Sequence, residues 1–338
     1  MSRLPSVSCL IAAYNFERFV ARAVESALAQ DYPPELLEVV VVDDGSTDGT
    51  ARALQPYLGR VRYVHKRNGG LLTTVDRLLR ESTGELLALL SGDDEWPPDR
   101  VRRGAGFLAE HPEVGLVHGD LELIDETGRV YERSYWKANG IEPAEGRVFG
   151  RLLESSVVSG GGMMFRSAFL ADILPFPDEA PCEDWWIALC VARRAPVAAL
   201  PGPPVYRYRL HGSNMSHGDG GERLSRRLLG ETRLMRRMLA EVRPGEAMPG
   251  ELVRALAKLE WIVREHAPAV GLRPDEVYRP GTGALAAARE AEAAGARSLA
   301  AGEAEAAACF FVRALALDPA APAAGRGLRA ALALRGGG

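Results

Sequence analysis

The chain has 338 residues, enough to bury a large core and to form more than one domain. Hydrophobic residues make up 47%, charged residues 25%, and the net charge is −4, which is ordinary for a globular protein and gives no sign of a nucleic-acid-binding surface. The sequence has no run of the roughly 20 apolar residues that a membrane-spanning helix needs. Its N-terminal apolar run, Val7–Ala13, is too short for a signal peptide. The four scattered cysteines favour reduced thiols and a cytoplasmic protein.

Strand and helix patterns alternate along the first quarter of the chain. Strands are predicted at Val7–Ala13, at the valines of 39–42, at Val61–His65 and at Leu86–Leu90. Helices are predicted after a cap at Asn15, with an apolar stripe reaching Leu28, from near Thr47, and over Leu71–Ser82. Nearly continuous apolar strands separated by helices indicate an α/β fold with a mostly parallel sheet covered on both faces.

Two of these strands run into pairs of aspartates. Asp43-Asp44 lies in EVVVVDDGSTDGT, and Asp93-Asp94 lies in ELLALLSGDDEW. Ligands bind beyond the carboxyl ends of parallel strands, so both pairs are expected at one binding edge. Their hard oxygen atoms favour a divalent cation that bridges to phosphates. For each pair alone, ordinary turn chemistry is the alternative explanation.

The turn after the first strand excludes two other nucleotide-binding motifs. Its sequence, AAYNFERF, lacks the glycines of a dinucleotide-binding fingerprint and the Gly-Lys-Ser/Thr of a P-loop. A nucleotidyltransferase would be expected to carry a glycine-rich, basic loop here, so that class of enzyme is disfavoured.

Taken in order, these motifs resemble the family 2 glycosyltransferases, an inverting family with the A-type, nucleotide-diphosphosugar-binding fold. The resemblance spans residues 5–217 and continues through NGGLLTTVDRLLRESTGELLALLSGDDEWPPDRV, GGMMFRSAFL, CEDWWIALCVARR and YRYRLHGSNMS. It implies a Rossmann-like sheet and transfer of a sugar, with UDP as the expected nucleotide, to an acceptor hydroxyl. Polysaccharides, glycolipids, proteins and secondary metabolites are the acceptor classes it implies. A catalytically inactive relative that binds nucleotide sugars or acts as a scaffold is the rival interpretation.

The resemblance also assigns a nucleotide-sugar site to the loops at the strand ends. Asp44 is expected to bind the nucleotide, and Asp43 is expected to support the same pocket. The other residues expected there are Ala12, Tyr14, Asn15, Asn68, Gly70, Ser91, Asp93, Gly161, Gly162 and Trp185. Ser91 stands where the family commonly has an aspartate. Thr74-Val75-Asp76 replaces the family's Ala-Arg-Asn, so one arginine contact to a phosphate or base is missing.

Mn²⁺ or Mg²⁺ is the cofactor that the resemblance implies. It places the metal on Asp94 and Asp93, and His211 is a further candidate ligand. A bound metal would stabilise the diphosphate leaving group. Asp184 occupies the position of the general base, with Glu183 beside it, and a single displacement would invert the sugar. Both carboxylates precede a predicted helix, where acidic residues are also common for electrostatic reasons alone.

The composition changes after residue 220, which suggests three domains. Residues 1–220 are predicted to form the catalytic domain, 221–283 a helical extension, and 284–338 an alanine-rich helical tail. In the tail, the spacing of Gly295, Ala307, Phe311, Ala314 and Pro319 matches one tetratricopeptide-like helical pair. A protein partner, a second copy of the chain, or the catalytic domain itself could cover such a pair. Peripheral association with a membrane is also compatible with the sequence.

Overall fold

The computed structural model describes residues 3–178, 180–214, 221–269, 271–273, 277, 279–321 and 323–335. The chain divides into two compact units. The first contains Met1–Arg147, Ser156–Pro177 and Cys182–His217, and the second contains Val148–Ser155, Asp178–Pro181 and Gly218–Gly338. The polypeptide therefore passes between the two units more than once.

A seven-stranded sheet forms the centre of the first unit. Its strands are β1 (Val7–Ala13), β2 (Leu37–Asp43), β3 (Arg62–His65), β4 (Leu86–Ser91), β5 (Leu116–His118), β8 (Met164–Arg166) and β9 (Val197–Ala199), in the order β3-β2-β1-β4-β8-β5-β9. Only β8 runs antiparallel to its neighbours in this sheet. The mostly parallel sheet predicted from the sequence is confirmed, because the first four strands lie close to their expected positions.

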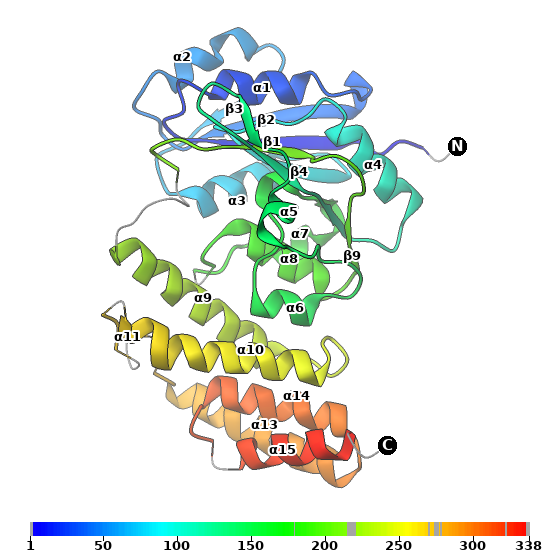
Figure 1. The fold of residues 1–338 in the computed structure, drawn as a ribbon, viewed down its shortest axis with the longest axis vertical. Coiled ribbons are helices and arrows are strands. Elements are labelled where there is room, and N and C mark those ends of the chain that lie inside the picture. The colour runs from blue at the N-terminus through cyan, green and yellow to red at the C-terminus, as the bar shows by residue number, and fades with distance from the viewer. Residues whose placement is uncertain are drawn as a thin grey trace. The chain divides into compact units, whose positions relative to one another are not determined.

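Helices cover the sheet on both faces. They are α1 (Val20–Leu28), α2 (Thr50–Leu54), α3 (Leu71–Glu81), α4 (Arg100–Glu110) and α8 (Glu183–Ala192). The same unit also contains the short α5 (Tyr135–Asn139) and α7 (Leu170–Ile173), of which α7 packs against α8. Figure 1 shows α1 and α3 on opposite sides of the sheet. Alternate β1 side chains, among them Cys9 and Ile11, pack into one apolar cluster with Val20 and Val24 of α1. Alternate side chains of the strand thus pack against the apolar face of α1 in the core.

A second, three-stranded sheet lies within the same unit. It consists of β10 (Tyr206–Arg209), β6 (Leu121–Ile124) and β7 (Val130–Glu132), in the order β10-β6-β7. A hairpin turn joins the antiparallel strands β6 and β7. Asp125 holds it, because its side chain accepts hydrogen bonds from the Thr127 amide and hydroxyl and from the Arg129 amide.

The prediction that Asn15 caps the first helix is wrong. The helix begins at Val20, and Asn15 has a backbone φ of 55°, in the left-handed region. Its side-chain oxygen instead accepts a hydrogen bond of 2.8 Å from the Thr47 amide, on the loop that follows β2. Asparagine tolerates this backbone conformation better than most residues, so it joins two loops at the carboxyl edge of the sheet.

All regular secondary structure in the described residues of the second unit is helical, as expected for the C-terminal extension. It contains α6 (Phe149–Glu154), α9 (Gly221–Glu241), α10 (Pro249–Trp261), the π-helical turn η5 (Ile262–His266), α11 (Ala267–Ala269), α13 (Thr282–Ala300), α14 (Ala304–Leu317) and α15 (Ala324–Arg335). Helix α14 packs against α9, α10, α13 and α15, so the regions before and after residue 283 share one compact unit. The finer division into two helical domains stays a prediction. In the described part of the chain, every helix is too short or too polar to cross a membrane.

The tetratricopeptide-like pair predicted in the tail corresponds to α13 and α14. A methyl group on Gly295 of α13 would lie 2.8 Å from the ring of Phe311 on α14. On α15, a methyl group at Gly327 would lie 2.2 Å from the same ring. Phe311 is buried, and the two glycines let the neighbouring helices approach its ring closely.

Candidate active site

The two aspartate pairs lie at the same edge of the seven-stranded sheet. Ala13 of β1 pairs with Asp43 of β2, and Ala12 pairs with Ser91 of β4, so the carboxyl ends of the three strands are level. The Asp44 amide donates to the Ala13 carbonyl, and the Gly92 amide donates to the Ala12 carbonyl. These bonds continue the sheet by one residue into each acidic loop.

Asp43 is fully buried and is held by its own loop. One carboxylate oxygen accepts hydrogen bonds from the Ser46 amide and hydroxyl, at 2.9 and 2.6 Å. The other accepts a hydrogen bond of 2.9 Å from the Tyr63 hydroxyl on β3. Burial is the main cause, and Asp43 a further cause, of the raised Tyr63 pKa. Asp43 therefore shapes the loop in which Asp44 lies.

Asp44 anchors the loop that leads into α3. Its carboxylate accepts hydrogen bonds from the amides of Gly69 and Gly70, at 2.9 and 2.8 Å, and forms an ion pair with Lys66. The Lys66 ammonium also donates to the Thr73 hydroxyl at 2.8 Å. Gly70 has a φ of 86°, which favours glycine at this position. Asp44 thus fixes the Lys66–Gly70 segment, which includes Asn68, beside the edge of the sheet.

The loop after β1 places Tyr14 and Asn15 next to these residues. The Tyr14 side chain is exposed, and Ala12 is buried in the strand below it. Besides its bond to Thr47, Asn15 donates its backbone N–H to the Ser46 hydroxyl at 2.9 Å. The β1 and β2 loops are therefore locked together, with an exposed aromatic ring at their surface.

Asp93 and His211 form a close pair. The His211 Nε2 atom lies 3.0 Å from Asp93 Oδ2, and both side chains are almost entirely buried. The imidazole stacks on the ring of Phe19, with ring centres 4.9 Å apart and an interplanar angle of 29°. The second carboxylate oxygen, Asp93 Oδ1, is buried without a hydrogen-bond partner among the described residues.

Asp94, by contrast, has both oxygens occupied by the protein. One accepts a hydrogen bond from the Tyr206 hydroxyl, and the other accepts one of 2.7 Å from the Arg209 amide. Burial, followed by the negative charge of Asp93, raises the pKa of Asp94 well above its usual range. Burial, followed by the charge of Asp94, likewise raises the pKa of Tyr206. Asp94 therefore joins the loop after β4 to β10.

The glycine segment forms a tight turn, η3 (Gly160–Gly162), that faces the protein interior. The Gly161 carbonyl accepts a hydrogen bond of 2.9 Å from the Trp96 indole, and the Gly162 carbonyl accepts one of 3.2 Å from Arg100. A methyl group on Gly161 would lie 2.1 Å from the Tyr206 ring, so a side chain cannot be placed there without displacement. Glycine at Gly161 is thus required by the close approach of Tyr206.

Glu183 and Asp184 form the first turn of α8. The Asp184 carboxylate accepts a hydrogen bond of 2.6 Å from the Trp185 amide. A methyl group on Gly160 would lie 3.1 Å from Glu183 Oε1, so the acidic pair lies against the glycine turn. Burial, followed by the charge of Asp184, raises the pKa of Glu183 to about 8. The Trp185 ring is buried in the core, with 3% of the residue exposed.

Three residues that contribute to this arrangement were not predicted from the sequence. Tyr206 and Arg209 lie on β10 and contact Asp94, whereas Lys66 contacts Asp44 from the end of β3. The alternating pattern YRYR before His211 is typical of a strand and could have suggested β10, but its pairing with β6 is not predictable from local sequence. Ser91, at the end of β4, accepts a backbone hydrogen bond of 3.1 Å from the Asp94 amide.

Comparison with known proteins identifies the first part of the chain. Residues 8–174 match the family described as glycosyl transferase family 2. An uncharacterized glycosyltransferase from Rickettsia felis is 30% identical over 198 residues, which are 57% of this chain and 32% of that protein. The chain thus spans about a third of the length of that relative.

Solved structures share the fold. A mannosyltransferase from Pyrobaculum calidifontis, in complex with GDP-Man and Mn²⁺, has a TM-score of 0.58 at 21% identity, covering 98% of this chain and 87% of that one. S. aureus TarS 1-349, in complex with UDP-GlcNAc, has a TM-score of 0.52 at 18% identity, covering 92% of this chain and 91% of that one. The A-type fold expected from the sequence is therefore confirmed.

Proposed function

Residues 8–174 make this chain a member of glycosyl transferase family 2, and we propose that it transfers a sugar from a nucleoside-diphosphate donor to an acceptor hydroxyl with inversion. The expected nucleotide is UDP. The observation that carries the proposal is the Asp93–His211 pair with its unpartnered oxygen, set at the sheet edge that Asp44 also occupies. The rest of the proposal follows from what each neighbouring group can do.

The chemistry of the pair fits a divalent cation. Asp93 offers a carboxylate oxygen that lacks a hydrogen-bond partner in the described structure, and His211 offers an imidazole nitrogen beside it. The described residues contain no cluster of three or more His, Cys, Asp or Glu side chains placed to hold a metal. Mg²⁺ commonly binds through one or two carboxylates plus substrate phosphates, so a small protein ligand set is compatible with a donor-dependent site. Mn²⁺ or Mg²⁺ held there would neutralise charge on the diphosphate leaving group.

We assign Asp44 and its loop to the nucleotide. In the described structure its oxygens are engaged by Lys66 and by two backbone amides. A nucleobase that hydrogen-bonds to Asp44 must therefore share or displace the Lys66 contact. The exposed Tyr14 ring next to this loop offers a flat apolar surface for a base.

Asp184 is the proposed general base. It would accept the proton of the acceptor hydroxyl while the acceptor oxygen forms a bond to the anomeric carbon of the sugar. The bond from that carbon to the diphosphate oxygen breaks with its electron pair leaving on the phosphate, and the anomeric configuration inverts. Glu183, whose pKa is raised, keeps a proton at neutral pH and so adds no second negative charge beside Asp184.

Calorimetric titration with nucleoside diphosphates tests the proposal. UDP and GDP are each titrated into the protein, first in EDTA and then in Mn²⁺. We expect UDP to bind tightly only with the metal, because the carboxylates of the edge repel an uncompensated diphosphate. Equal affinity in both conditions would remove the metal from the proposal. If neither nucleotide binds in either condition, the proposed donor class is wrong.

A further inference from the structure

Arg209 on β10 is fully buried, and its side-chain hydrogen-bond donors contact the loops around the Asp93–His211 pair. Its Nε donates to the Asp93 carbonyl at 2.8 Å, and its backbone amide donates to Asp94. Its Nη1 donates to the carbonyls of Asp125 and Glu126, at 3.0 and 3.3 Å. The remaining terminal nitrogen, Nη2, forms an ion pair with Glu95. One guanidinium thus holds three backbone carbonyls and one carboxylate.

The same guanidinium also contacts the aromatic ring on which His211 stacks. The Arg209 Cζ atom lies 5.2 Å from the centre of the Phe19 ring. His211 stacks on that ring with centres 4.9 Å apart. Arg209 therefore touches the backbone of one member of the pair and the supporting ring of the other.

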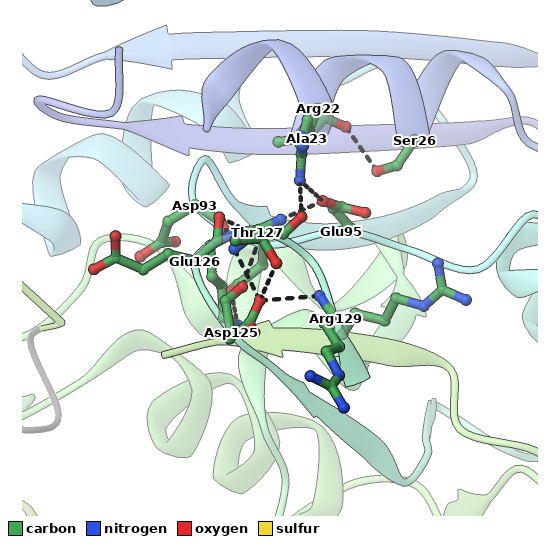
Figure 2. A network of polar contacts seen from close by, with 12 residues as sticks. Arg22, Ala23, Ser26, Asp93, Glu95, Asp125, Glu126, Thr127 and Arg129 are labelled. Carbon is green, nitrogen blue, oxygen red and sulfur yellow. Dashed lines mark hydrogen bonds and ion pairs between the residues drawn. The ribbon is translucent and has the colours of Figure 1, made fainter. Parts of the chain in front are cut away.

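A neighbouring arginine, Arg22, links α1 to the same loops. Figure 2 shows Arg22 reaching from its helix toward Glu95 and Thr127. Its Nη1 atom donates to the Thr127 carbonyl at 2.7 Å and lies 3.9 Å from the Glu95 carboxylate. The buried Arg209 guanidinium is thus surrounded by four elements: helix α1, the loop after β4, the β6–β7 turn and its own strand β10.

We propose that Arg209 is a positioning residue that sets the geometry of the Asp93–His211 pair. A guanidinium is required because its planar fork donates in several fixed directions at once, whereas an ammonium is a compact point charge. Lysine at this position would keep the charge beside Glu95 but could not reach all three carbonyls. The Asp93 backbone and the Phe19 ring would then lose their common support, and the carboxylate and imidazole would no longer be held at a fixed separation.

A purely structural role for Arg209 would also make its replacement harmful, because a buried charge that loses its partners is costly. Arg166 on β8 provides a matched control. It too uses its guanidinium to donate to three backbone carbonyls, those of Val114, Leu108 and His111. None of these belongs to the acidic loops or to the glycine turn. Arg166→Lys therefore shows the effect of losing a guanidinium that holds three carbonyls at a place outside the candidate site.

The experiment compares wild type, Arg209→Lys and Arg166→Lys by two readouts. The first is the NMR signals of the His211 ring in metal-free protein with labelled histidines; the chain has six, and His211→Gln identifies the signal. The second is Mn²⁺ affinity, measured with Mn²⁺ alone. We expect Arg209→Lys to move the His211 signals and to weaken Mn²⁺ binding by about tenfold or more, as loss of an outer-sphere partner does elsewhere. Arg166→Lys should do neither.

Unchanged His211 signals in folded Arg209→Lys protein would overturn the proposal, and so would equal changes in Arg166→Lys. The Mn²⁺ readout rests on the proposed function, but the NMR readout does not. If wild-type protein binds no Mn²⁺, the metal role fails, while the histidine signals still decide whether Arg209 positions the pair. Should Arg209→Lys fail to fold, Arg209→Gln, which keeps a planar amide donor, provides the same two readouts.

Discussion

The imidazole of His211 lies 3.0 Å from the carboxylate of Asp93, although 118 residues separate them in the chain. Asp93 follows the central strand β4, and His211 follows β10 in the three-stranded sheet. The pairing therefore depends on how the two sheets of the first unit are joined. The contact with His211 also distinguishes Asp93 from the adjacent Asp94, which accepts a hydrogen bond from Tyr206 instead.

Replacing each aspartate in turn should separate their roles. We expect Asp93→Asn to weaken Mn²⁺ binding by about 10- to 100-fold, because it removes the negative charge of the proposed ligand. In Asp94→Asn the amide can accept from the Arg209 amide and donate to the Tyr206 oxygen, so Mn²⁺ affinity should change little. Calorimetry with Mn²⁺ measures both. The reverse ranking of the two variants would place the cation on Asp94.

The glycine turn provides a steric prediction. Gly161→Ala should lower the free energy of unfolding by about 1–3 kcal/mol, because the new methyl group overlaps the Tyr206 ring. Gly106→Ala on α4 is the control, since a methyl group there meets no atom within 4 Å. Alanine should stabilise that helix by about 0.5–1 kcal/mol. Urea denaturation of both variants checks the result, and similar behaviour of the two would contradict the packing described here.

Glu183 should make stability depend on pH. Its carboxyl keeps a proton up to about pH 8 in the folded protein, but loses it near pH 4.5 when unfolded. Between these values the unfolded state binds fewer protons, so the stability of the wild type falls as pH rises. Glu183→Gln cannot ionise. Its stability relative to wild type should increase by at least about 1 kcal/mol from pH 5 to pH 8.

Denaturation at several pH values measures this difference. Glu35→Gln, at an exposed position, serves as the control and should keep a constant offset from wild type. A constant offset for Glu183→Gln as well would show that its carboxyl is ionised in the folded protein at neutral pH.

Asp184→Asn tests the proposed base. Asparagine has nearly the same size and can accept the same hydrogen bond from the Trp185 amide, but it cannot take up a proton. Turnover should fall by about 10²- to 10⁴-fold. Nucleotide and Mn²⁺ affinities should hardly change, since we assign those contacts to Asp44 and Asp93. Product formation at saturating donor is the measurement, with hydrolysis of the donor by water as the first assay. Near-normal turnover would show that Asp184 is not the base.

Removing the tail should leave nucleotide binding intact. The proposed site residues all belong to the first unit, whereas residues 284–338 belong to the second. Deletion takes away α14, whose Arg313 donates to the Ala240 carbonyl of α9 at 3.0 Å. We therefore expect the helical unit to lose stability, with changes in oligomeric state or acceptor use. Light scattering, circular dichroism and nucleotide titration measure these properties.

Phe311→Ala is the matched variant of full length. It should destabilise the helical unit by about 3–5 kcal/mol and leave nucleotide affinity unchanged. Loss of nucleotide binding in either protein, if still folded, would make the tail part of the binding site.

The sequence was most informative where structure follows from short-range pattern. The apolar runs predicted the strands, and the acidic pairs were predicted at one edge because parallel strands end together. Asn15 shows where this reasoning fails. Its type suggested a helix cap, but its partner is the Thr47 amide, 32 residues away. Local sequence does not reveal which loop a side chain will meet.

The same limit applies to the candidate site. Asp93 and Asp94 are equivalent in sequence, yet one contacts His211 and the other is buried against Tyr206. The difference arises from the position of β10, which depends on pairing between distant strands. A resemblance to a family could suggest His211, but it could not predict that Arg209 would be fully buried between the loops.

Helix α6 has a consequence for how this protein can be recombined. Residues 148–155 lie in the first half of the sequence, but they belong to the helical unit, where α6 packs on α10. Leu152 and Leu153 are completely buried. A chimera that exchanges everything after residue 220 with another family member would join one parent's α6 to the other parent's α10. Exchange of the whole helical unit therefore requires three grafted segments, Val148–Ser155, Asp178–Pro181 and Gly218–Gly338, and two of them lie within the part of the sequence that otherwise forms the first unit.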